Sequence, residues 1–204
     1  FVTASNGVCV CFMDAALLRR IFPHGRIVGP SMMPFSLKTF IRLSAQRSST
    51  SWRPKKPVSF VGSLYEPRTT TLFQIRNALE KSGIAFDVST RKMGEQKGPE
   101  DSYWESLSGS EIQVTTTSQL RHRGADMSEV NQLVYRATEA LVCGAALVIE
   151  DVEGMSDFFR DGVHLFSFGT PEGAAMIIVD LLADRSKLAS VKMQGQKKIE
   201  EIIR

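Results

Sequence analysis

The chain lacks a strong charge of either sign. Its 204 residues carry a formal net charge of +3, and its basic residues are spread along the sequence. Domains that bind nucleic acid concentrate positive charge on one surface, so this pattern does not favour nucleic acid as a partner. The most basic stretch, residues 42–56, also holds a run of serine and threonine. We interpret it as a solvated linker, with an RNA or membrane contact as the alternative.

Cysteine is scarce and lacks the spacing of metal ligands. The three cysteines, Cys9, Cys11 and Cys143, are an odd number, which argues against a disulfide framework. Cys9 and Cys11 alternate within an apolar run and Cys143 precedes a glycine, so all three are interpreted as small core residues. Nothing in this usage indicates an oxidising compartment, and we expect a cytoplasmic protein.

Long apolar runs and several well-known signatures are also missing. No apolar segment approaches the length that spans a bilayer. The chain starts at Phe1 without the charged segment of a signal peptide, and we expect it to be a piece of a longer protein. The patterns GxGxxG, Walker A and GxSxG are all absent. The sequence therefore offers no motif for a dinucleotide or P-loop site, and Ser63 is not expected to be a nucleophile.

What the chain has instead is an alternation of strands and helices from Pro57 onward. Its content of 43% hydrophobic and 23% charged residues is ordinary for a globular protein. Strands spaced by helices predict βαβ crossovers, and hence an α/β domain whose parallel sheet is covered by helices on both faces. We expect strands at 58–61, 85–89, 112–116, 146–150 and 164–168, and helices at 67–82, 103–108, 128–142, 154–159, 171–183 and 186–203.

The first part of the chain has a different composition. A strand at 8–12, a helix at 14–21 and a strand at 26–28 are predicted there. Four prolines then occur among serines and basic residues in the segment 29–57, which marks a boundary. We therefore predict three parts: a partial first domain at 1–40, a linker at 41–56 and the main domain at 57–204.

The turn after the strand at 58–61 is the first candidate site. It reads VSFVGSLYEPR, and a glycine such as Gly62 at a strand end lets backbone amides approach an anion closely. Pro67 fits the first turn of the next helix, whose N-terminus would favour phosphate. Arg68 at that position could bind phosphate oxygens through its fork of N–H donors. The alternative is an ordinary turn with a solvent-exposed arginine.

The helix at 128–142 is the second candidate. Asn131 and Glu139 are eight positions apart, so they project within about 80° of each other, with Arg136 between them. A carboxylate near a ligand groove could accept both hydroxyls of a ribose, and an asparagine nearer the N-terminus of the helix could reach the base, the sugar or a phosphate. The alternative is a solvated polar face with an incidental ion pair between Arg136 and Glu139.

Together these residues resemble a known family. The pattern R-x-x-E-A-L-x-x-G, from Arg136 to Gly144, is followed by a buried strand and resembles the nucleotide-binding signature of GT-B glycosyltransferases. In family 4 of these enzymes two glutamates separated by seven residues mark the donor site. Glu139 matches the second, whereas Asn131 stands in place of the first. An asparagine there is similar to the spore-maturation-protein (CgeB-like) branch, and the motifs F-x-D-G, T-P-E and L-L-A-D in the tail agree.

The resemblance implies a function and a set of roles. The domain at 57–204 would be the C-terminal half of a GT-B fold, which binds a nucleoside-diphosphate sugar, and residues 1–40 would end an N-terminal Rossmann-like domain that holds an unknown acceptor and the catalytic base. Gly62, Ser63 and Arg68 would face the pyrophosphate, Arg68 would stabilise the leaving group, and Glu139 would hold the ribose. The transferred group would be a hexose, with neither metal nor cofactor required, and this part alone would be inactive.

The loop after the strand at 112–116 holds a further candidate residue, and two other functions stay open. His122, between Arg121 and Arg123, is a candidate because it follows the strand at 112–116, although an exposed basic loop is the alternative. Asp151 and Glu153 could touch sugar hydroxyls or serve only in solvation and capping. A non-catalytic nucleotide-sugar binding module and a GT-B-shaped nucleotide-sugar epimerase remain as alternatives to the transferase.

Overall fold

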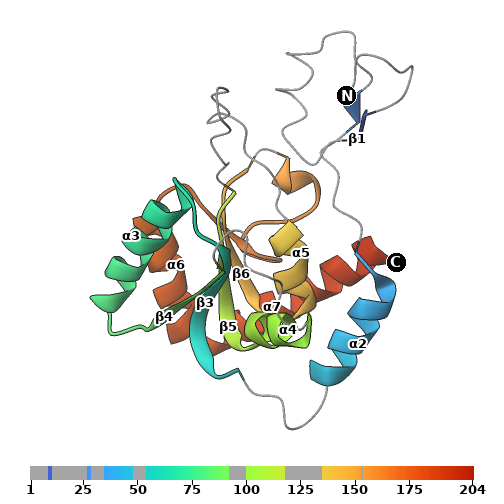
Figure 1. Ribbon diagram of the computed structural model, residues 1–204, viewed down its shortest axis with the longest axis horizontal. Coiled ribbons are helices and arrows are strands. Elements are labelled where there is room, and N and C mark those ends of the chain that lie inside the picture. Colours follow the sequence, from blue (N-terminus) through green and yellow to red (C-terminus); the bar gives the residue numbers. More distant parts are fainter. Residues whose placement is uncertain are drawn as a thin grey trace.

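A single parallel sheet forms the centre of the protein. The computed structural model describes residues 9–10, 27–28, 35–47, 54–91, 100–117, 135–152 and 154–204. The sheet has five strands in the order β4-β3-β5-β6-β7, and every neighbouring pair is parallel. The strands are β3 (Lys56–Ser63), β4 (Phe86–Arg91), β5 (Ser110–Thr115), β6 (Ala146–Glu150) and β7 (Phe166–Phe168). Because all of them point the same way, their carboxyl ends share one edge, which is uppermost in Figure 1.

Helices cover both faces of this sheet (Figure 1). One face packs against α3 (Arg68–Glu80) and α6 (Pro171–Ala183) through buried side chains such as Ile75 and Ile178. The other face packs against α4 (Glu100–Ser108) and α5 (Tyr135–Val142), with Leu107 and Leu141 in its core. The predicted α/β class, a Rossmann-like parallel sheet with helices on both faces, is therefore confirmed.

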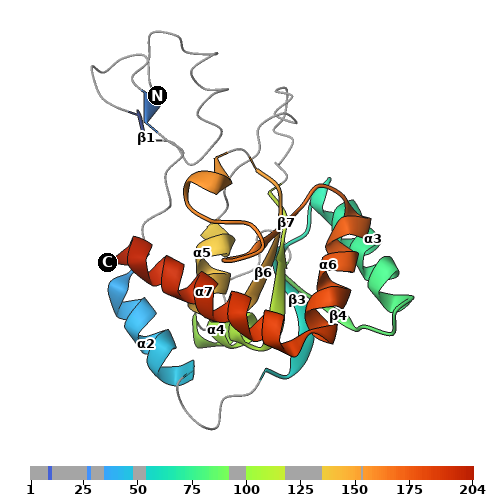
Figure 2. The ribbon, with the colours of Figure 1, turned by 180° about the vertical axis from the view of Figure 1, so that it is seen from behind.

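The last helix, α7 (Arg185–Ile203), joins the two cores. Leu188 near its start belongs to the core of the α3 face, whereas Ile199 near its end belongs to the core of the α5 face. Figure 2 shows it crossing the domain from one side to the other. Gly195 allows this close crossing, because a Cβ added there would lie 2.3 Å from the backbone oxygen of His164.

Most predicted elements are present with shifted ends. β3 begins before and ends after the predicted strand, and β7 is shorter than its prediction. The expected short helix at 154–159 is a 3-10 turn, η1 (Met155–Asp157). Of the helix predicted at 128–142, the described part is α5, because residues 118–134 lie outside the described residues. Element type is set by the period of buried residues, whereas element ends depend on capping and neighbours, which explains this pattern of agreement.

The start of the chain contains two short strands. β1 (Cys9–Val10) pairs in parallel with β2 (Ile27–Val28), within the two regions where the sequence predicts strands. The helix predicted at 14–21 lies outside the described residues.

Residues 37–47 are helical, although the sequence predicts a linker from residue 41. They form α2 (Leu37–Arg47), in which Phe40 is 3% exposed and Leu43 is 5% exposed. Both side chains join the same core as Ile199 of α7. Arg42, one of the basic residues that suggested a linker, is exposed on this helix, and residues 48–53 of the same stretch lie outside the described residues. The predicted boundary between residues 40 and 41 therefore falls inside a helix, and the division into domains stays a prediction.

Among the residues described, no helix is both long enough and apolar enough to cross a membrane.

Candidate functional site

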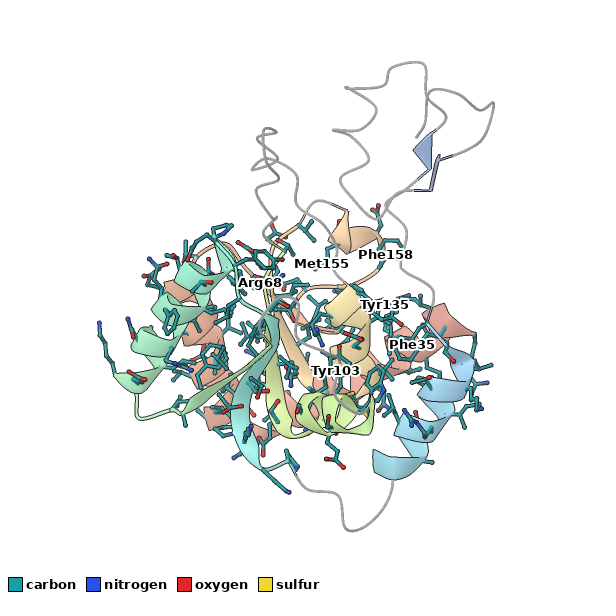
Figure 3. The ribbon with its side chains drawn as sticks, in the orientation of Figure 1. Phe35, Arg68, Tyr103, Tyr135, Met155 and Phe158 are labelled. Atoms are coloured by element: carbon teal, nitrogen blue, oxygen red, sulfur yellow. The ribbon has the colours of Figure 1, made fainter. Side chains whose placement is uncertain are left out.

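A hollow of about 320 Å³ lies where the carboxyl ends of β3 and β5 meet the start of α5. Ligands of open α/β sheets bind outside this edge of the sheet. In Figure 3, Arg68 lies on the α3 side of the edge and Tyr135 on the α5 side. The residues that line the hollow are Phe60, Val61, Gly62, Ser63, Tyr65, Arg68, Thr115, Thr116, Tyr135 and Arg136.

Arg68 is fixed at this hollow by three hydrogen bonds. Its Nε donates to Oγ1 of Thr116 at 2.8 Å, its Nη1 to the carbonyl of Ser63 at 3.1 Å and its Nη2 to the carbonyl of Thr116 at 3.5 Å. The guanidinium also lies over the ring of Tyr65, 4.2 Å from its centroid. One arginine thus bridges the ends of two neighbouring strands, and this anchoring holds its charge at a defined point of the edge.

The charge of Arg68 is largely withdrawn from water. Burial chiefly lowers the pKa of its guanidinium and the positive charge of Arg136 adds to this, whereas Tyr65 and Glu150 act in the opposite direction. The acceptors of these three hydrogen bonds are a hydroxyl and two carbonyls, all of them neutral, and the carboxylate of Glu150 adds an electrostatic attraction. An arginine keeps its proton under these conditions. A desolvated guanidinium that is hydrogen-bonded mainly to neutral acceptors favours an anionic ligand.

Arg136 is the second cation of the hollow and is held by two other side chains. Its Nη1 donates to the hydroxyl of Tyr103 and lies 3.2 Å from Oε2 of Glu139. The same hydroxyl donates to Oε2 of Glu139 at 2.5 Å. Burial raises the pKa of Tyr103, so its phenol stays protonated at neutral pH and acts as a donor. These three side chains form one connected polar group beneath the hollow.

The predicted site residues are brought together only in part. Gly62, Ser63, Arg68 and Arg136 line the same hollow. Glu139 lies next to it but is only 6% exposed and is absent from its lining. Two predicted residues, His122 and Asn131, fall outside the described part of the chain.

Packing explains why position 62 is a glycine, and the sequence does not reveal this. A Cβ added to it would lie 2.9 Å from Cζ of Phe60, two positions earlier on the same strand. Phe60 is 2% exposed, and its ring lies 5.6 Å from the guanidinium of Arg68. The glycine thus makes room for a ring that supports Arg68, and its predicted approach to an anion stays a prediction.

The start of α3 differs slightly from the expectation. Pro67 occupies the N-cap position rather than the first turn of the helix. The amide of Thr69 donates to the carbonyl of Tyr65 at 3.0 Å. Part of the expected phosphate-binding capacity of this helix end is therefore used by the preceding turn, and the Arg68 side chain is the clearer anion-binding feature.

Sequence reasoning missed several residues of the site. Thr116 and Tyr65 hold Arg68, and Tyr103 holds Arg136. Glu150, at the end of β6, accepts hydrogen bonds from the amide and hydroxyl of Thr117 at 2.8 and 3.2 Å, and so fixes the chain just beyond β5. The run of threonines at the end of a predicted strand was a usable signal, whereas nothing local to Tyr103 pointed to its contacts.

A hollow of about 440 Å³ between α2 and α7 contains none of the predicted site residues. Within the residues that the structure describes, no group of three or more His, Cys, Asp and Glu side chains is arranged to hold a metal ion.

Comparison with known proteins gives one family and a set of similar folds. Residues 58–201 match the profile of the family described as glycosyl transferase-like. No curated protein matches the sequence. Among solved structures, HepE from Anabaena in complex with UDP and glucose aligns with a TM-score of 0.62 at 13% identity, covering 96% of this chain and 59% of that one.

Other solved structures align similarly. TarM from S. aureus, in a complex that includes UDP, gives a TM-score of 0.65 at 13% identity over 96% of this chain and 42% of that one. A glycosyltransferase from Rickettsia africae gives 0.58 at 9% identity, over 96% and 59%. At such identities the likeness shows a shared fold. The chain spans about 59% of HepE and less of TarM.

Proposed function

The chain belongs to the glycosyl transferase-like family, and from that premise we propose that it forms the donor-binding half of an enzyme that transfers a hexose from a nucleoside-diphosphate sugar to an acceptor. The observation that carries this proposal is the placement of Arg68 and Arg136 on one hollow at the carboxyl edge of the sheet. A diphosphate is the part of such a donor that two guanidinium groups recognise best.

The reaction gives these charges a chemical task. The bond between the sugar C1 and the diphosphate oxygen breaks, the acceptor oxygen bonds to C1, and a base takes the acceptor proton. Negative charge grows on the departing diphosphate as this happens. Arg68, held by Ser63 and Thr116, would stabilise that charge without having to reorganise, which is the arrangement that favours catalysis.

The remaining predicted residues complete the proposed donor site. Gly62 and Ser63 would lie beside the diphosphate, and Asn131 and His122 would add polar contacts from the segment after β5. Contact of Glu139 with the ribose stays a prediction, because its Oε2 is engaged by Tyr103 and Arg136. With two guanidinium groups to balance the diphosphate, we expect no metal requirement. The other half of the enzyme would supply the acceptor site and the catalytic base.

The neighbours suggest which donor to test first. HepE and TarM were both solved with UDP bound, so UDP is the first probe for this hollow. Isothermal titration of the purified chain should show saturable binding of UDP and much weaker binding of uridine, because most of the affinity comes from the diphosphate. A panel of ADP, GDP and UDP would identify the base.

Two outcomes of this titration would count against the proposal. If UDP and uridine bind with equal affinity, the two arginines do not contact the diphosphate. If no nucleoside diphosphate binds, the hollow is not a donor site. Transfer is tested separately, by release of UDP from UDP-sugars in the full-length protein. Binding without release in that protein would favour the non-catalytic binding module.

A further inference from the structure

Tyr103 is a buried polar residue in a place that the donor reaction alone does not explain. It comes from α4, whereas Arg136 and Glu139 lie one turn apart on α5. Its ring packs edge-on against Trp104 at 5.1 Å, and the guanidinium of Arg136 lies 4.9 Å from its centroid. Its hydroxyl contacts both members of the α5 ion pair. One phenol therefore connects α4 to the only two charged side chains of α5.

The contacts define the direction in which the guanidinium of Arg136 points. An arginine side chain has many rotamers, and holding it in one of them costs conformational entropy. Here a hydrogen bond, an ion pair and a ring face restrain it, while its side chain stays 21% exposed and lines the hollow. Glu139, with a side chain only 8% exposed, lies on the inner side of this group.

The same contacts also offset the repulsion between the two arginines of the hollow. Arg68 and Arg136 line the same hollow and repel each other before a ligand arrives. Burying a second guanidinium there is costly unless an opposite charge is close. Glu139 supplies that charge, and Tyr103 ties the pair together. Arg136 can therefore stay beside Arg68 in the empty site instead of turning to solvent.

We propose that Tyr103 and Glu139 are positioning residues, which hold the guanidinium of Arg136 at the hollow opposite Arg68 so that the two arginines bind one diphosphate. This inference rests on the proposed function. It gives Glu139 a role different from the predicted contact with ribose, because its carboxylate acts on the diphosphate through Arg136. Tyr103 is then a determinant of donor affinity that touches no donor atom.

The test compares two probes, inorganic pyrophosphate and UDP, which share the phosphates but not the ribose. Tyr103→Phe removes the hydroxyl and keeps the ring against Trp104. It should weaken both probes by the same factor, about tenfold, as expected for a lost hydrogen bond to a charged group. Glu139→Ala should do the same, and Glu139→Gln, which keeps an acceptor for Tyr103, should recover part of the affinity.

A double-mutant cycle separates positioning from general damage. In an Arg136→Ala background, Tyr103→Phe should change the pyrophosphate affinity less than twofold, because the side chain that it positions is gone. Glu201→Ala is the matched control, since the exposed Glu201 forms an i,i+3 pair with Lys198 on α7, and it should leave both affinities unchanged. Thermal unfolding midpoints establish that each variant is folded.

Three results would overturn the inference. Unchanged pyrophosphate affinity in Tyr103→Phe would contradict it. So would a loss from Tyr103→Phe that is equally large in the Arg136→Ala background, because that result indicates a merely structural effect. A loss of UDP affinity but not of pyrophosphate affinity in Glu139→Ala would restore the ribose contact. If the wild-type chain binds neither probe, the proposed function itself fails. The three results above are obtained with a wild-type chain that binds, so they count against this inference alone.

Discussion

Nε of Arg68, the first residue of α3, donates a hydrogen bond to Oγ1 of Thr116, 2.8 Å away and 48 positions later in the chain. Arg68 follows β3, and Thr116 follows β5, which is the neighbour of β3 in the sheet. The bond therefore closes the gap between two adjacent strand ends. It fixes the position of one of the two arginines that line the hollow, and with it the place of the proposed diphosphate.

Replacing Arg68 tests the charge itself. Arg68→Ala should weaken UDP on the order of 100-fold, because charge-assisted hydrogen bonds to the diphosphate are lost. Uridine should lose little affinity. Titration of both ligands gives the two ratios. Arg185→Ala is the control, since Arg185 pairs with Glu111 at the opposite end of β5 and should not affect either ligand. Equal losses of UDP and uridine would contradict a phosphate contact.

Thr116→Val tests the anchor rather than the charge. Valine keeps the shape of the threonine but offers no acceptor to Arg68, so the guanidinium loses a 2.8 Å hydrogen bond. We expect UDP affinity to fall about fivefold, the effect of one modest hydrogen bond. Thr116→Ser retains Oγ and should stay within twofold of wild type. A loss in Thr116→Ser but not in Thr116→Val would point to packing of the methyl group instead.

Phe40→Ala tests whether α2 belongs to the folded domain. The ring is 3% exposed, and its removal should lower the free energy of unfolding by about 3 kcal/mol through lost burial and a cavity. Urea denaturation gives this value. Ile41→Ala, at a position that is 56% exposed, should cost well under half as much. Equal small effects would mean that α2 does not contribute to the cooperative core.

Gly195→Ala tests the crossing of α7. The added Cβ would lie 2.3 Å from the backbone oxygen of His164 and 2.9 Å from Cδ2 of Leu141, and backbone atoms cannot move aside cheaply. Despite the better helix propensity of alanine, we expect a loss of about 2 kcal/mol in the free energy of unfolding. Gly169→Ala, with nothing within 4 Å of its added Cβ, should be tolerated. A stabilised Gly195→Ala protein would refute this crowding.

His164 should make stability depend on pH. Burial chiefly lowers its pKa, with Lys198 adding to the effect, and its Nδ1 accepts a hydrogen bond from the amide of Arg160 at 2.9 Å. The unfolded chain therefore takes up the proton first, and stability falls as the pH drops below about 6.5. The decrease should level off below the folded pKa.

The control for this pH effect is His164→Asn, whose side-chain oxygen can accept the same hydrogen bond without titrating. Urea midpoints measured between pH 7.5 and 5.5 should fall less steeply in this variant than in the wild type. The other histidines are present in both proteins and cancel in the comparison. Parallel curves would show that His164 does not contribute.

Local sequence patterns predicted much of the fold and some of the site. The buried run Ala146–Glu150 and the periodic segment Pro171–Ala183 each had the right type, because the spacing of apolar residues directly reflects the faces of strands and helices. The position of Arg68 after a strand end also placed it at the correct edge. The ends of elements and the helix at 37–47 were not predicted, because polar residues on the outer face of a helix look like those of a linker.

From Pro57 onward, the sequence by itself determined the order of strands and helices along the chain, the parallel sheet and the edge at which Gly62, Ser63, Arg68 and Arg136 meet. Only the tertiary structure decided the partners of these residues. Tyr103 lies 36 positions before Glu139 and 33 before Arg136, so their contact depends on how α4 packs beside α5. No local periodicity encodes that contact, since it arises when two helices bury their apolar sides on one face of the same sheet.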